Sequence, residues 1–131
     1  MTNLKKLCTT LGTALGFSLA AALAFGHHST NGIYDEAREI ELTGTVQAWR
    51  FINPHPSLTL EVTAADGTVA QWDVSYGGSA VTHLVRRGYS AETFKPGDTI
   101  TVKGHPALLE GAHGLLMERN NPTRADGTPL L

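Results

Sequence analysis

The sequence predicts an all-β protein with one short helix, a small barrel of five to six strands that follows a signal peptide. Several short segments alternate polar and apolar residues, which is the period of a half-buried strand. Turn residues separate these segments, and only one segment between them has helical spacing. A basic and then apolar leader precedes them all.

The leader has the composition of a secretory signal peptide. Lys5 and Lys6 make its start basic, and residues 7–25 are uncharged and end in small residues. Several threonines and glycines make this stretch a poor membrane-spanning helix. We therefore expect cleavage of residues 1–26, a periplasmic domain at residues 27–131, and no stable membrane insertion of the cleaved protein.

Composition limits the function of this domain. About 105 residues suffice for one compact domain. Without Lys5 and Lys6 the net charge is −4 with neutral histidines, so nucleic acid, which needs a basic surface, is not expected as a partner. The single cysteine, Cys8, lies in the leader, which excludes disulfides, thiol catalysis and thiolate metal ligands from the mature chain.

The first strand is expected from Glu39 through Phe51, with a break in its alternation. Ile40, Leu42 and Val46 share one parity, whereas Trp49 and Phe51 share the other. If all of them face the core, a β-bulge near residues 47–48 must absorb the change of phase.

Four further strands and one helix follow. A hairpin turn at residues 65–67 separates the second and third strands. The helix should end at Gly88, the usual position of a C-terminal glycine. Residues 120–131 read as a tail. The expected strands are 58–62, 69–74, 99–104 and 114–118, and the expected helix is 79–87.

The resulting order of elements is that of an oligonucleotide/oligosaccharide-binding (OB) barrel, in which the loops after strands one and four lie at one pole. Those loops hold His55 and, in residues 104–114, His105 and His113. Twelve residues with a reach of roughly 40 Å separate His27 from the first strand, so the amino terminus could also reach this pole.

Cleavage would place a free amine beside His27 and His28, a combination that favours copper. A cut after Ala24 leaves Phe25-Gly26-His27, whose amine, two amides and imidazole form a planar site for Cu(II) or Ni(II). A cut after Gly26 leaves His27 first, so that its amine and ring chelate together and a further His completes a T-shaped brace. A polar terminus that holds two histidines by chance is the plain alternative.

Other residues have plainer interpretations. His83 lies among polar helix positions and is expected to be solvated. Trp49 and Trp72 are expected in the core, although an exposed pair could stack on a sugar or another flat ligand. Residues 34–36 are a weaker candidate for copper or calcium than for a loop. No hydrolase, phosphate-loop or metalloprotease motif is present, so no catalytic residue is proposed.

The chain resembles a family of small exported bacterial proteins known only as a domain of unknown function. The resemblance implies an exported β-barrel and no established activity. Two departures from the family pattern are the inserted Phe25-Gly26 and Ser75, which stands where relatives tend to have an acidic residue. The motifs that carry it are His27-His28-Ser29, residues 43–46, Asn53-Pro54-His55, Leu84 with residues 87–89, residues 95–98, and Asp126-Gly127.

Together these features predict a periplasmic protein that captures or delivers copper. His27 would supply the primary chelate, with His28 and His55 as the next ligands and His105 and His113 as further candidates. The alternatives are a metal-free exported binding module that uses Trp72, and an accessory subunit of a periplasmic redox enzyme. A copper oxidase is the enzymatic version, for which the sequence supplies no substrate pocket.

Overall fold

The computed structural model describes residues 32–117 and 119–131. The expected signal peptide, His27 and His28 therefore lie outside the described residues, as does Glu118 at the expected end of the fifth strand. The elements are β1 (Ile40–Arg50), β2 (Ser57–Thr63), β3 (Val69–Ser75), α2 (Val81–Arg86), β4 (Thr99–Pro106), β5 (Gly114–Leu116) and β6 (Thr123–Arg124).

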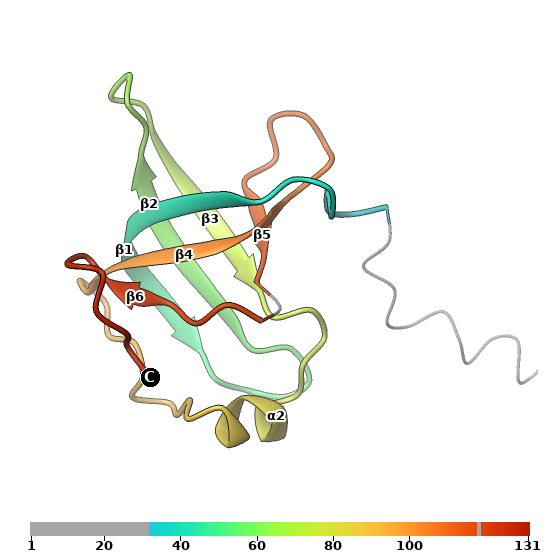
Figure 1. Ribbon diagram of the computed structural model, residues 1–131, viewed down its shortest axis with the longest axis vertical. Coiled ribbons are helices and arrows are strands. Elements are labelled where there is room, and N and C mark those ends of the chain that lie inside the picture. The colour runs from blue at the N-terminus through green and yellow to red at the C-terminus, as the bar shows by residue number, and fades with distance from the viewer. Residues whose placement is uncertain (1–31, 118) are drawn as a thin grey trace, which may run out of the picture.

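The strands form a closed barrel (Figure 1). The order is β1-β2-β3-β5-β4, and pairing of β1 with β4 closes the barrel. β3 and β5 are parallel, whereas the other pairs are antiparallel. β6 is an extra strand that pairs with Ile100 and Thr101, on the edge of β4 that β1 does not occupy. The predicted fold class, a barrel of five to six strands with one short helix, is confirmed.

The expected bulge in β1 is present. The register of β1 against β2 shifts between Val46 and Ala48, so Gln47 is the extra residue. Ile40, Leu42, Val46 and Trp49 consequently all pack on the same core. Earlier in β1, Gly44 permits a close approach of two strands, because a Cβ there would lie 2.7 Å from the Glu61 carbonyl oxygen of β2.

Alternate residues of each strand fill the barrel interior. Leu58, Leu60 and Leu115 are fully buried, and Val74 is 1% exposed. Burial of each such side chain contributes about 1.5–3 kcal/mol of hydrophobic free energy. The other buried apolar residues are Val46, Tyr76, Leu84, Tyr89, Phe94, Ile100, Val102, Leu116 and Met117.

An aromatic cluster fills the barrel end beside α2. Trp49 lies at its centre, with ring-centroid distances of 5.0 Å to Phe94 and 5.7 Å to Tyr76. The Trp49 indole N–H donates to the Ser90 carbonyl over 2.8 Å. Burial raises the pKa of Tyr89 and raises that of Tyr76 well above its usual value. The two phenols influence each other's pKa, yet within residues 32–117 and 119–131 neither buried hydroxyl has a hydrogen-bond partner.

α2 is shorter than expected at its amino-terminal end. Ala80 is extended, and the first helical amide, that of Val81, donates to the Asn53 side-chain oxygen over 3.0 Å. The helix therefore begins where an acceptor from a distant loop is available. Its carboxyl end is as expected. Gly88 has a φ of 95°, a value typical of glycine, and the Gly88 and Tyr89 amides donate to the Val85 and Leu84 carbonyls, respectively.

The expectation of a tail at residues 120–131 is wrong. Ile100 and Thr101 of β4 pair with Arg124 and Thr123, and Leu130 packs against the core. A strand of two residues is too short to show any periodicity, so the sequence pattern contained no sign of it.

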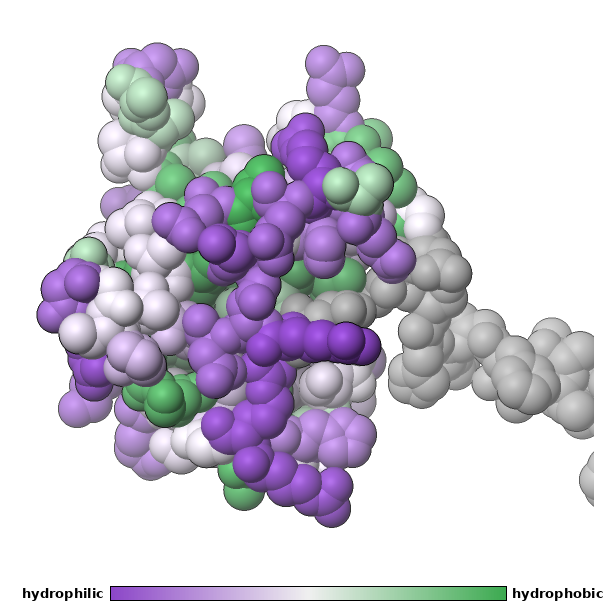
Figure 2. Space-filling model, viewed as in Figure 1, coloured by the Kyte–Doolittle hydropathy of each residue, from purple (hydrophilic) through white to green (hydrophobic). Residues whose placement is uncertain are grey.

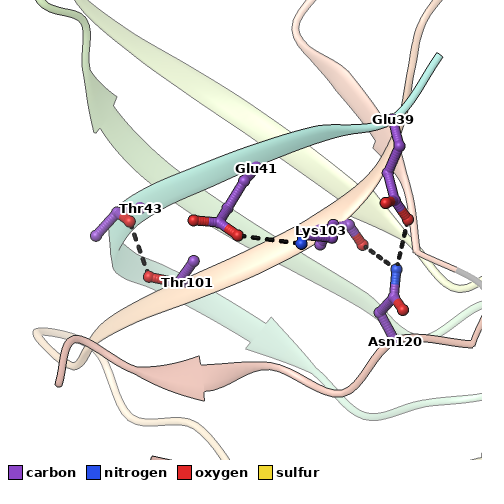
Figure 3. A network of polar contacts seen from close by, with 6 residues as sticks. All are labelled: Glu39, Glu41, Thr43, Thr101, Lys103 and Asn120. Atoms are coloured by element: carbon purple, nitrogen blue, oxygen red, sulfur yellow. Dashed lines mark hydrogen bonds and ion pairs between the residues drawn. The ribbon is translucent and has the colours of Figure 1, made fainter. Parts of the chain in front are cut away.

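One face of the barrel is hydrophilic. In Figure 2 the side toward the viewer, over β4 and β6, is mostly polar. Figure 3 shows how its side chains pair across β1 and β4: Glu41 lies 3.4 Å from the Lys103 ammonium, and the Thr43 and Thr101 hydroxyls are 2.8 Å apart. These polar groups are exposed cross-strand pairs, which stabilise the register of the sheet.

Candidate functional site

Two of the candidate histidines line one groove. This groove, of about 330 Å³, lies along the outer side of β2, β3 and β5. His55 comes from the loop that precedes β2, and His113 from the residue that precedes β5. Both are exposed. The other lining residues are Tyr34, Pro56, Ser57, Asp73, Val74, Ser75, Ala112 and Gly114.

The loop of His55 is held at both sides. Asn53 bonds to the first turn of α2, and Pro56 is buried. Ser57 then starts β2 opposite Ser75, the last residue of β3. The Asn53-Pro54-His55 motif therefore has a structural function at Asn53, and it leaves the His55 ring at the surface of the groove.

His113 is placed by β3. Its carbonyl accepts the Asp73 amide over 2.9 Å, which extends the parallel pairing of β3 and β5 by one residue. Its ring lies against Trp72, with centroids 5.1 Å apart and an interplanar angle of 52°. The Asp73 carboxylate is exposed on the same side and accepts a hydrogen bond from the Thr59 hydroxyl over 3.2 Å.

His55 and His113 do not by themselves make up a complete metal site. Ser57 pairs with Ser75, and Gly114 pairs with Asp73, so Ser57 and Gly114 are two strands and two residues apart. Strand spacing and rise put their Cα atoms at about 12 Å. Among the residues that the structure describes, no group of three or more His, Cys, Asp or Glu side chains could hold a metal ion. A metal ion held in this groove by three or more such side chains would need a donor from outside the described residues.

Tyr34 ties the segment before β1 to this groove. It forms an isolated β-bridge with Ala107, and the next amide, that of Asp35, donates to the Pro106 carbonyl over 2.8 Å. The Asp35 carboxylate accepts the Ala37 amide over 3.2 Å and the Asp35 carbonyl accepts the Arg38 amide over 3.1 Å, so residues 35–38 form a turn. The sequence pattern gave no sign of the Tyr34 anchor, because a single bridged residue has no period.

His105 and His83 lie outside this groove. The His105 ring faces outward from β4, and its Nδ1 donates to the Arg38 carbonyl over 2.9 Å. His83 is exposed on α2, as expected. Of the three imidazoles expected together at one rim, the described structure places His55 and His113 in one groove and His105 outside it.

Asp73 and Asn53 were not singled out as site residues from the sequence. The outward parity of Asp73 in the third strand was the available signal for it. For Asn53, no local pattern could reveal that its partner is the Val81 amide, 28 residues away.

No helix in the described ranges is long and apolar enough to cross a membrane. A comparison with curated proteins finds no match to the chain. A family model described as a family of unknown function, DUF6152, matches residues 16–117. The matched segment contains the His27-His28 pair and every barrel strand from β1 to β5, but ends before β6. Since this match covers most of the sequence, the chain belongs to the DUF6152 family.

Proposed function

We propose that the protein is a periplasmic copper-binding protein that captures or delivers copper through its amino terminus. After cleavage of the leader, the amine and imidazole of His27 form the primary chelate, and His28 is a second donor. The chelate docks in the groove that His55 and His113 line, where one of these imidazoles completes the site.

The observation that carries this proposal is the position of Tyr34. Tyr34 lines the same groove as His55 and His113, and it follows His27 by only seven residues. Seven extended residues span at most about 25 Å. The His27-His28 pair is therefore within reach of the groove, and so short a tether raises its local concentration there.

The chemistry of the available donors favours copper. Imidazole, amine and carboxylate groups are present, and Cys8 lies in the expected leader, so thiolate ligands are absent from the mature chain. Such nitrogen and oxygen donors suit Cu(II), which leads the divalent affinity order. Asp73 is the carboxylate nearest to these donors in the groove lining. Copper bound here would be a cargo for transfer and not the centre of a reaction.

His105 is not included in this ligand set. Its Nδ1 is engaged by the Arg38 carbonyl, and it does not line the groove. We assign it the role of linking β4 to the segment that leads into β1.

The start of the mature chain decides the form of the site. A start at His27 permits the brace and makes a groove histidine necessary for tight binding. A start at Phe25 creates a planar site that is independent of the barrel, and an uncleaved leader leaves no free amine near His27. The intact mass of protein purified from the periplasm distinguishes the three, and we expect a start at His27.

Metal analysis and competition titration test the proposal. We expect one equivalent of copper with a nitrogen or nitrogen/oxygen spectrum. His27→Ala should weaken binding at least about 100-fold, because loss of an outer-shell partner alone costs 10–100-fold. Of His55→Ala and His113→Ala, the variant that removes the completing imidazole should weaken binding by more than about tenfold. His83→Ala, the matched control on α2, should have no effect.

Three results would contradict the proposal. Equal copper affinities of the His27→Ala and His83→Ala proteins would exclude the amino-terminal site. Absence of stoichiometric copper after reconstitution would favour the metal-free alternatives, namely an exported binding module or an accessory subunit of a periplasmic redox enzyme. Affinity that does not change between about pH 5.5 and 7.5 would indicate carboxylate ligands, because histidine ligands must lose a proton near pH 6.5.

A further inference from the structure

A second hollow lies at the end of the barrel opposite α2. It has a volume of about 390 Å³ and lies beside the β2–β3 hairpin. Figure 1 shows that this hairpin and the loop between β4 and β5 both project from the upper end of the barrel, whereas α2 lies at the lower end. We call this hollow the barrel mouth; Leu42, Val62, Ala70, Trp72 and His113 line it, together with Glu41, Thr43, Thr63, Ala64 and Thr68.

The walls of the barrel mouth are apolar. Leu42, Val62 and Trp72 are only partly buried, and they pack on the core from above. They belong to β1, β2 and β3, so three strands hold them in place. The only charged lining residue, Glu41, is paired with Lys103 at 3.4 Å. The site therefore offers apolar contact and no net charge to a ligand.

Trp72 forms the aromatic part of this wall. His113 covers part of its ring at a centroid distance of 5.1 Å. The indole N–H of Trp49 is satisfied by Ser90, but among the described residues the Trp72 N–H has no hydrogen-bond partner. Nor does this N–H belong to the buried polar atoms that lack a partner, so it is accessible at the barrel mouth to solvent or to an acceptor on a ligand.

We propose that the barrel mouth binds an uncharged, flat aromatic molecule of about two fused rings, which stacks against Trp72. A cavity of about 150 Å³ is enough for benzene, so the barrel mouth has room for a larger ring system. A sugar is a poorer fit because most of the accessible lining surface is apolar, and the Thr43 hydroxyl already bonds to Thr101. This site does not depend on copper.

Indole is a suitable probe, and NMR of the mature protein is a suitable assay. Titration should shift the Trp72 Nε1–H and the His113 ring protons, and should leave the Trp49 Nε1–H unchanged. A molecule of this size that buries one face is expected to bind with a Kd of about 1 mM.

Two variants test the location of binding. Trp72→Leu keeps the wall apolar and should weaken indole binding about tenfold or more, which is the usual contribution of aromatic stacking. Ala70→Phe fills the barrel mouth while leaving Trp72 in place, and should abolish binding even if Trp72→Leu fails to fold. Val69→Ala, on the exposed outer side of β3, is the matched control and should bind indole normally.

Three results would overturn the proposal. One is the absence of any shift at Trp72 up to about 10 mM indole, well above the expected Kd. Another is unchanged binding by the Ala70→Phe protein. The third is that nuclear Overhauser contacts place residues 27–31 in the barrel mouth, so that this segment is the occupant. Loss of copper binding in the same samples would not affect the result, because the probe titration is carried out without metal.

Discussion

Replacing Asn53 by alanine should destabilise the protein by removing the acceptor that caps α2. In the folded state the Asn53 side chain accepts the Val81 amide over 3.0 Å, and no side chain of the helix itself provides a cap. Loss of an N-terminal cap costs 0.5–2 kcal/mol and typically about 1 kcal/mol. We expect about 1 kcal/mol, because the bond is exposed and water can replace part of it.

That free energy can be measured by thermal and urea unfolding followed by circular dichroism. In a domain of about 100 residues, 1 kcal/mol lowers Tm by roughly 4–8 °C. Asn53→Asp keeps an acceptor oxygen and should restore most of the loss. His55→Ala is the matched control in the same loop, because His55 is exposed and should leave Tm unchanged.

Hydrogen exchange locates the effect. The Val81 amide should exchange faster in the Asn53→Ala protein, whereas the β2 amides should change only with global stability. An Asn53→Ala protein with the Tm of the wild type, or with an equally protected Val81 amide, would refute the cap and its role in placing His55.

Three further predictions concern the barrel. Tyr76→Phe should leave stability unchanged or raise it by about 1 kcal/mol in urea unfolding, because the lost hydroxyl is buried and has no partner in the described part of the chain. Gly104→Ala should prevent folding or lower Tm strongly, since a Cβ would overlap the Leu116 carbonyl, whereas Gly114→Ala, with 3.4 Å to its nearest atom, should be tolerated. Burial raises the pKa of Tyr76 and Tyr89, so the unfolded chain loses these protons first. Their contribution to stability should be constant below the usual tyrosine pKa of about 10 and fall above it, and the phenolate absorbance of these two residues should appear only as circular dichroism is lost.

The fold was largely predictable because its signals are local and periodic. The change of parity between Val46 and Trp49 predicted the bulge at Gln47, and Gly88 predicted the end of α2. The predictions of the start of α2 and of a tail in place of β6 were wrong, and the physical reason is the same for both. Both depend on partners far away in the sequence, the Asn53 side chain for one and the β4 edge for the other.

The candidate site was less predictable than the fold. The sequence indicated His55 and His113 as residues of two loops, but it could not give the register that places Ser57 opposite Ser75 and Gly114 beside Asp73. That register places His55 and His113 on one groove, whose lining does not include His105. The Tyr34 bridge, which brings the amino-terminal segment to the same groove, is equally a long-range contact.

Fluorescence of the mature protein during titration with Cu(II) tests the central proposal most directly. His113 lies against Trp72, so paramagnetic copper bound in the groove should quench Trp72. We predict that one equivalent quenches the wild-type emission, that Trp72→Phe removes most of this quenching, and that His27→Ala shifts it to much higher copper concentrations. Tight copper binding without quenching, or quenching that Trp72→Phe leaves unchanged, would contradict docking of the amino-terminal site in the groove.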